Sequence, residues 1–313
     1  MNITAKNIYI LLRIIIGAFF IGSAVTKLIS IDSFEVFIYS LGLLNLDLSF
    51  LAARLVLSFE LFTGILLITG IGLRVVIPAT IALLTLFTAF IIWLMMFRSN
   101  SHCFCFGDIV KISNLWSVVK NIVLIMLLLV IARQPRATKQ YRMTRHHAIS
   151  VRYSMLIIIA ALVVSLALPV ISSPPDTFYY KHYSKNVTYD QLMLQEFLDE
   201  HSELKDGKRI VCFFGTGCRF CSLAVQKITV IADKADKADA VSCVFWGKEE
   251  SVQGFYEVTN SHDFPYHMLS PDIFLRITNG EMPLILLLQD GVTQEKFGYR
   301  SINEKQIIEF LSN

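Results

Sequence analysis

Two cysteines at a Cys-x-x-Cys spacing, Cys218 and Cys221, are the residues of this sequence best suited to chemistry. They follow the apolar run 210–214 and stand where a helical pattern begins. Unpaired N–H groups and the dipole at a helix N-terminus favour an anion, so the Cys218 thiol should ionise more readily than a free thiol. Cys221 lies one turn further along the same helix face, close enough to attack a mixed disulfide at Cys218. The spacing therefore predicts a redox motif with Cys218 as the attacking thiol and Cys221 as the resolving thiol.

The same spacing also fits a structural disulfide or half of a zinc site. A zinc site needs further ligands, and no second Cys-x-x-Cys or Cys/His pair follows the motif. We therefore favour the redox interpretation, and no metal is expected.

A second pair, Cys103 and Cys105, stands between two apolar runs. His102 precedes it and Asp108 follows closely, so a metal corner is an alternative to a thiol pair. That alternative is weaker, because a fourth ligand has to come from elsewhere in the chain.

The remaining cysteines, Cys212 and Cys243, fall within apolar strand patterns. Free cysteine behaves as a small apolar residue and is often fully buried. We expect these two to be buried packing residues, with a second cysteine pair as the alternative.

The composition divides the chain into two parts. It has 313 residues, of which 54% are hydrophobic and 17% charged, and the apolar residues are concentrated in the first half. A single soluble fold of this length is rarely so apolar, so a membrane half followed by a soluble half is expected. The formal net charge is +3 and the basic residues cluster in one segment, so nothing indicates a nucleic-acid partner.

Five apolar runs are long enough to cross a bilayer, which needs about 20 residues. The runs cover residues 8–29, 50–71, 75–97, 115–132 and 154–171. The first is long for a signal peptide and further runs follow it, so we interpret it as a membrane helix.

Basic residues in the segment 133–152 set the expected orientation. Six Lys and Arg residues lie there, so this loop should be cytoplasmic. If each apolar run crosses the membrane once, the N-terminus lies inside. The loops 30–49 and 98–114 and everything after residue 172 then lie outside. All six cysteines then lie on the outer face, which suits an oxidising compartment. We expect the inner membrane of a bacterium, with the C-terminal domain in the periplasm.

The soluble part begins after a helix-breaking Ser-Ser-Pro-Pro stretch at 172–175. Helix and strand patterns alternate beyond it, and Asp290-Gly291 between two strand patterns is a hairpin signal. The expected organisation is a four-helix membrane domain at 1–133, a basic loop at 134–153, a fifth membrane helix at 154–171, a linker at 172–177 and a periplasmic domain at 178–313.

The order of elements in 178–313 resembles a thioredoxin fold, with Cys-x-x-Cys after the central strand and Met282-Pro283 opening the penultimate strand. The resemblance implies that Pro283 is cis and lies beside Cys218, and that the backbone of Met282 binds a substrate strand. Thioredoxins carry a buried acid on the strand before the motif. The matching position here is Cys212, which leaves the proton acceptor for Cys221 unassigned.

The membrane half resembles the DoxX and MauE family of four-helix membrane proteins. The matching features are Arg13, Gly17, Phe20, Gly22, Ser23, Lys27 and Leu28 in the first helix, Glu60, Gly64 and Gly70 in the second, and Cys103-Phe104-Cys105-Phe106-Gly107 before the fourth. Joined to a thioredoxin-like domain, the layout is similar to redox-associated membrane proteins and to vitamin K epoxide reductase fused to thioredoxin. The resemblance implies a redox role and, by analogy with the latter, a membrane quinone as electron acceptor.

Glu60 lies deep in the second apolar run, where a carboxylate is costly and usually functional. Lys27 and Arg54, nearer the outer interface, are its expected partners. A structural ion pair and a role in proton or quinone handling are equally favoured, and we group Asp108 with these three residues as a candidate for the second role.

The sequence thus predicts an all-α membrane bundle followed by an α/β thioredoxin-like domain, acting together as a thiol-disulfide oxidoreductase. Electrons are expected to pass from periplasmic client thiols to Cys218 and Cys221, then to Cys103 and Cys105, and on to the quinone pool. The alternatives are a membrane-tethered reductase or isomerase running in the opposite direction, and a non-enzymatic assembly factor.

Overall fold

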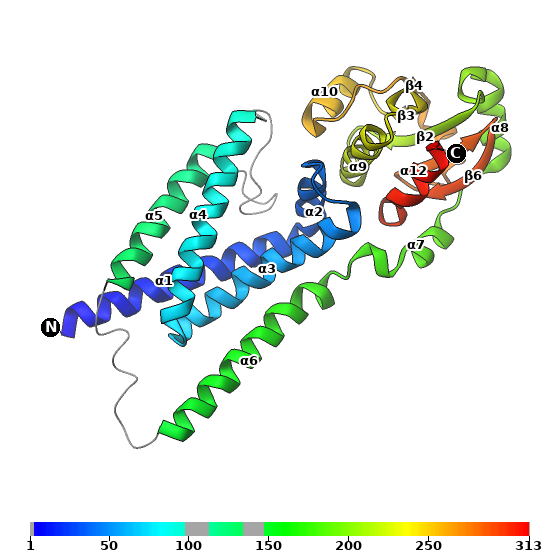
Figure 1. Ribbon diagram of the computed structural model, residues 1–313. Helices are drawn as coiled ribbons and strands as arrows, with labels where there is room; N and C mark the ends of the chain where they lie inside the picture. Colours follow the sequence, from blue (N-terminus) through cyan, green and yellow to red (C-terminus); the bar gives the residue numbers. More distant parts are fainter. Residues whose placement is uncertain (1–2, 98–112, 134–146, 313) are drawn as a thin grey trace. The chain divides into compact units, whose positions relative to one another are not determined.

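The computed structural model describes residues 3–97, 113–133 and 147–312 (Figure 1). The chain divides into two compact units. We name the first, Met1–Phe34 with Leu51–Pro174, the membrane unit, and the second, Glu35–Phe50 with Pro175–Asn313, the C-terminal unit.

Within the described residues, five helices are long and apolar enough to cross a bilayer. They are α1 (Ile3–Ile29), α3 (Leu46–Thr69), α4 (Leu73–Phe97), α5 (Asn114–Ala132) and α6 (His147–Ser172). Many of their large apolar side chains stay exposed, as a lipid-facing surface requires. The five predicted membrane helices are confirmed, and the protein is a membrane protein.

Small residues let α1 and α3 approach closely. A Cβ built on Gly17 would stand 2.8 Å from the carbonyl oxygen of Gly64, and one on Gly64 would stand 2.9 Å from that of Gly17. Near the end of α3, the Arg13 guanidinium donates a hydrogen bond to the carbonyl oxygen of Ile68 at 3.3 Å. Backbone contact of this kind is a common way for membrane helices to associate, since lipid offers them little hydrophobic driving force.

The C-terminal unit is built on a five-stranded sheet in the order β4-β3-β2-β5-β6. The strands are β2 (Lys208–Gly215), β3 (Val241–Trp246), β4 (Tyr266–Met268), β5 (Leu284–Gln289) and β6 (Val292–Phe297). Central β2 runs parallel to β3 and antiparallel to β5, and β5 and β6 form the predicted hairpin around Asp290 and Gly291, both at positive φ. This mixed sheet has the topology of the predicted thioredoxin-like fold.

Helices cover both faces of the sheet. They are α7 (Tyr180–Asn186), α8 (Gln191–Glu200), α9 (Arg219–Ala235), α10 (Glu250–Thr259), α11 (Pro271–Thr278) and α12 (Glu304–Ser312). Alternate residues of β2 enter two apolar clusters: Cys212 and Phe214 pack in the cluster that includes α9 and α10, and Val211 and Phe213 in the one that includes α8 and α11. Strand β2 is therefore buried on both faces, which explains its continuous apolar sequence.

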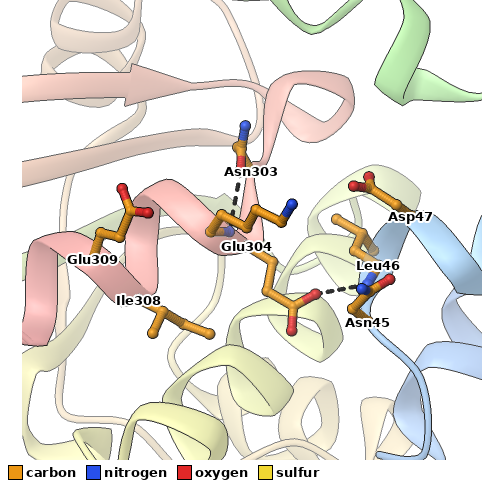
Figure 2. Close-up of a pocket in the computed structure, with 8 residues that line it drawn as sticks. Asn45, Leu46, Asp47, Asn303, Glu304, Ile308 and Glu309 are labelled. Carbon is orange, nitrogen blue, oxygen red and sulfur yellow. Dashed lines mark hydrogen bonds between the residues drawn. The ribbon is translucent and has the colours of Figure 1, made fainter.

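The segment 30–49 was expected as an outer loop and Phe50 as the start of the second membrane run, but residues 35–50 form part of the C-terminal unit. They include most of α2 (Ile31–Ser40), and Val36, Tyr39, Leu46 and Phe50 join the apolar cluster around α9. Figure 2 shows the Glu304 carboxylate accepting a hydrogen bond from the N–H of Leu46, at 2.6 Å. This contact caps the start of α3 with a negative charge, as a helix N-terminus favours.

Candidate functional site

Cys218 stands at the junction where β2 ends and α9 begins. It is the N-cap residue of α9, with extended backbone angles, and its sulfur accepts a hydrogen bond from the Cys221 N–H at 3.2 Å. The hydrogen bond from the Cys221 thiol, with those from the backbone N–H groups of Cys221 and Phe220, lowers the pKa of Cys218 to about 6. The half-buried Cys218 is therefore mainly a thiolate at neutral pH.

Cys221 is fully buried beneath Cys218. Burial raises the pKa of its thiol, and the hydrogen bond with Cys218 raises it further. The N–H of Gly215 at the end of β2 contacts its sulfur at 3.5 Å. The two thiols thus differ in acidity and in access, which is the difference that an attacking and a resolving cysteine need.

The peptide bond between Met282 and Pro283 is cis, as the resemblance implied. Both residues line a cavity of about 230 Å³ together with Phe220, Tyr299 and Arg300. The rings of Phe220 and Tyr299 lie with their centroids 5.0 Å apart. Because Phe220 sits between the two motif cysteines in the sequence, this cavity lies beside the redox motif.

A buried charged group supports the wall of this cavity. Lys227 of α9 is almost fully buried, with its ammonium 3.9 Å from the centroid of the Tyr299 ring and 3.9 Å from a carboxylate oxygen of Asp176. Arg300 donates to the other Asp176 oxygen at 2.9 Å. Sequence reasoning did not find Lys227, Asp176, Tyr299 or Arg300, because only the tertiary fold brings them together.

Cys212 and Cys243 are direct partners in the register of β2 and β3. Both are fully buried as free thiols. Burial, and then the contact with Cys243, raises the pKa of the Cys212 thiol. The position where thioredoxins carry an acid is therefore occupied by a protonated thiol.

In the membrane unit, the structure brings Lys27 and Glu60 together as an ion pair. Ser23 donates to the Glu60 carboxylate at 3.2 Å and lies 3.1 Å from the Lys27 ammonium. Arg54, expected beside Glu60, donates from Nε and Nη2 to the carbonyl oxygen of Ser173 at 3.2 and 2.7 Å. The role of these residues in proton or quinone handling stays a prediction.

Three predicted site residues, Cys103, Cys105 and Asp108, lie outside the described residues, as does His102 of the metal alternative. Within the described ranges, no group of three or more His, Cys, Asp or Glu residues is arranged to hold a metal ion.

This chain is similar to a known protein family over its first part and to a curated protein over most of its length. The family model of the methylamine utilisation protein MauE matches residues 5–134, which confirms the MauE resemblance of the membrane half. Protein TlpB of Flavobacterium psychrophilum is 22% identical over 315 residues, covering 82% of each chain. A solved structure of a secreted Mycobacterium tuberculosis disulfide oxidoreductase, described as homologous to DsbE of E. coli, aligns with 36% of this chain and 84% of its own, at 14% identity and a TM-score of 0.29.

Proposed function

We propose that this protein is a membrane-bound thiol-disulfide oxidoreductase that exchanges disulfides with client proteins through Cys218. The observation that carries the proposal is the pairing of a half-buried Cys218 thiolate at the start of α9 with a fully buried, protonated Cys221. The adjoining cavity, with cis Pro283 and the rings of Phe220 and Tyr299, offers an apolar surface for a client segment.

In the oxidised domain, a client thiolate attacks the Cys218 sulfur of the Cys218–Cys221 disulfide, and Cys221 leaves and takes up a proton. A second client thiolate then attacks the client sulfur of the mixed disulfide and releases Cys218 as a thiolate. The client gains a disulfide and the domain becomes a dithiol. The low pKa of Cys218 makes it a good leaving group in the second step, since thiols of lower pKa leave faster.

The same low pKa supports the direction from client to domain. Donors around Cys218 stabilise its thiolate and therefore the reduced form of the pair. A pair whose reduced form is stabilised has a more oxidising disulfide. A reductase or isomerase would run the same steps in reverse.

We further propose that a disulfide between Cys103 and Cys105 reoxidises the Cys218–Cys221 dithiol, and that a membrane quinone takes the two electrons and two protons onward. This step is supported by the sequence resemblance alone. Glu60 and Lys27 are the buried ionisable groups of the membrane unit that we assign to proton exchange with the quinone. A bound quinone would supply a two-electron acceptor within the bilayer.

The test is to express full-length Cys221→Ser and Cys218→Ser in cells and to look for mixed disulfides on non-reducing gels. We expect Cys221→Ser to trap clients on Cys218, because no resolving thiol remains, and Cys218→Ser to trap none. The opposite result would reverse the two roles. Full complementation of a deletion strain by both variants would favour the non-enzymatic assembly factor instead.

A further inference from the structure

The Cys212 and Cys243 thiols are the buried nucleophilic groups that the proposed exchange does not use. They occupy facing positions on the parallel strands β2 and β3, and both are fully buried. Their register neighbours are apolar: Ile210 faces Val241 and Phe214 faces Phe245. The two cysteines thus form a cross-strand pair in an otherwise apolar sheet face.

The geometry of the sheet suits a disulfide at this position. Neighbouring strands lie about 4.7–4.9 Å apart, within the Cα separation of about 4.4–6.8 Å that disulfides span. Residues in register on parallel strands also point to the same face of the sheet. A bond between Cys212 and Cys243 therefore joins two side chains of one sheet face, and it requires their Cβ atoms to come to about 3.5–4.5 Å, somewhat closer than the strand spacing.

The pair also lies near the redox motif. Cys212, Cys243 and Cys221 belong to one buried cluster, and the Cys212 and Cys221 thiols interact electrostatically. The hydroxyl of Tyr256 on α10 donates to the carbonyl oxygen of Phe264 at 3.1 Å, and Tyr256 belongs to the same buried cluster. Cys221 is thus the group through which electrons can reach the buried pair, because both inner thiols are closed to solvent.

We propose that Cys212 and Cys243 form a second redox couple that exchanges electrons with Cys218 and Cys221, so that the domain stores four electrons instead of two. The inference rests on the proposed function, since it needs an outer disulfide between Cys218 and Cys221. Packing alone explains one buried cysteine readily, but it does not explain two thiols paired in register beside a redox-active one.

The exchange balances without a further reagent. The Cys212 thiol gives up its proton as its sulfur attacks the Cys221 sulfur of the outer disulfide, and Cys218 leaves as a thiolate. Cys243 then attacks Cys212 and releases Cys221. The outer pair gains the two electrons that the inner pair loses as its disulfide forms. Of the two protons that the inner thiols lose, one goes to Cys221 and the other to solvent, because Cys218 stays mainly a thiolate.

The experiment counts thiols in the full-length protein carrying Cys103→Ser and Cys105→Ser, so that four cysteines remain. The protein is held in detergent at a series of glutathione ratios, quenched in acid, unfolded and alkylated with a maleimide mass tag. We expect no free thiols at the oxidising end and four at the reducing end. The same protein with Cys212→Ala and Cys243→Ala added should titrate only two.

A matched variant tests the route. With Cys218→Ser and Cys221→Ser added instead, the buried pair should lose its rapid equilibration with glutathione, because the connecting thiol is gone. Equally rapid equilibration would overturn the route through Cys221.

The result that overturns the inference is two titrating thiols, with Cys212 and Cys243 alkylated at every glutathione ratio. Failure of the proposed function looks different, because Cys218 and Cys221 would then stay reduced at every ratio as well. Thermal unfolding of the alanine variant shows whether it is folded. If it is not folded, the number of tags on the protein that carries only Cys103→Ser and Cys105→Ser still decides between two and four titrating thiols.

Discussion

In the membrane unit, the polar residues of the sequence motif face each other across α1 and α3. Lys27 pairs with Glu60, Arg13 donates to the Ile68 carbonyl, and Gly17 lies against Gly64. In the C-terminal unit, the motif stands at the end of a buried strand, where Cys221 is fully buried and Cys218 is half-buried with its charge stabilised. The motif residues of α1 and α3 therefore contribute to helix packing, whereas the Cys-x-x-Cys motif at the β2–α9 junction makes a cysteine reactive.

The largest expected effect concerns the reactivity of Cys218 and how it depends on pH. With a pKa of about 6, the thiolate fraction of Cys218 should fall only about tenfold between pH 7.5 and pH 5, whereas a thiol of pKa about 8.5 would lose roughly 300-fold. The rate of iodoacetamide labelling of the reduced full-length protein, followed by peptide mass mapping, measures this profile. Cys221 should stay unlabelled throughout, since it is buried and protonated. A 300-fold loss at Cys218 would show that the junction does not stabilise a thiolate.

The second prediction asks whether residues 35–50 belong to the packing of the C-terminal unit. Phe50 is about 1% exposed and packs in the cluster around α9, with the Lys227 ammonium 5.3 Å from its ring centroid. We expect Phe50→Ala to destabilise the unit by about 3–5 kcal/mol, as for other buried aromatic truncations. Leu48→Ala is the matched control, because Leu48 is 48% exposed.

Thermal unfolding in detergent, read by near-UV circular dichroism, gives both values. Equal losses for Phe50→Ala and Leu48→Ala would mean that the segment does not support the unit. The same reasoning predicts that a chain beginning at residue 172 unfolds at a lower temperature than one that also carries 35–50 on a flexible linker.

The third prediction tests the close packing of α1 against α3. Gly17→Ala places a methyl group 2.8 Å from the Gly64 carbonyl oxygen, so the helices must separate or shift. We expect a cost of about 1–3 kcal/mol, as for overpacked cores. Gly22→Ala on the same helix is the control, since a Cβ there meets nothing within 4 Å. Thermal stability in detergent measures both, and a Gly17 variant as stable as the Gly22 variant would contradict close α1–α3 packing.

The redox motif and most helices and strands of the C-terminal unit were predictable from sequence because their signals are local. Cys218 and Cys221 lie three residues apart, and the strands β2 and β5 carry continuous apolar runs. The apolar residues of α2 gave no such signal. A short apolar segment next to a membrane helix looks the same in sequence whether it faces lipid or packs against a soluble domain.

The residues around the cavity beside the redox motif could not be predicted from sequence, and the reason is a different one. Tyr299 reaches Phe220 and Lys227 only through the fold, across more than seventy positions of sequence. Lys227 also reads as an exposed helix residue, yet it is about 1% exposed. Long-range pairs of this kind carry no periodic signal, and a buried lysine contradicts the usual placement of its charge.

The smallest expected effect on stability is that of replacing Lys27 and Glu60 together. This comparison separates a packing role of Glu60 from a chemical one. If the Lys27–Glu60 pair only holds α1 to α3, removing one side chain outright leaves the other charge buried and costs about 3–5 kcal/mol, and a Gln that keeps a polar contact costs less. Replacing both with apolar residues is close to neutral. We therefore compare Glu60→Gln with the double variant Lys27→Met and Glu60→Met. Each is measured for thermal stability and for the rate at which Cys103 and Cys105 are reoxidised in membranes, read by mass-tag alkylation.

We expect both variants to slow reoxidation, while the double variant keeps nearly the stability of the unmodified protein, because methionine fills the space but cannot exchange a proton. Ser23 lies within hydrogen-bonding distance of both members of the pair, so Glu60→Gln retains part of the polar contact and its loss of stability should be modest. A double variant that is both stable and reoxidised at the normal rate would assign Glu60 to packing alone. The membrane unit would then be structural around Glu60, and the acceptor for the electrons of Cys103 and Cys105 would have to be sought at another site.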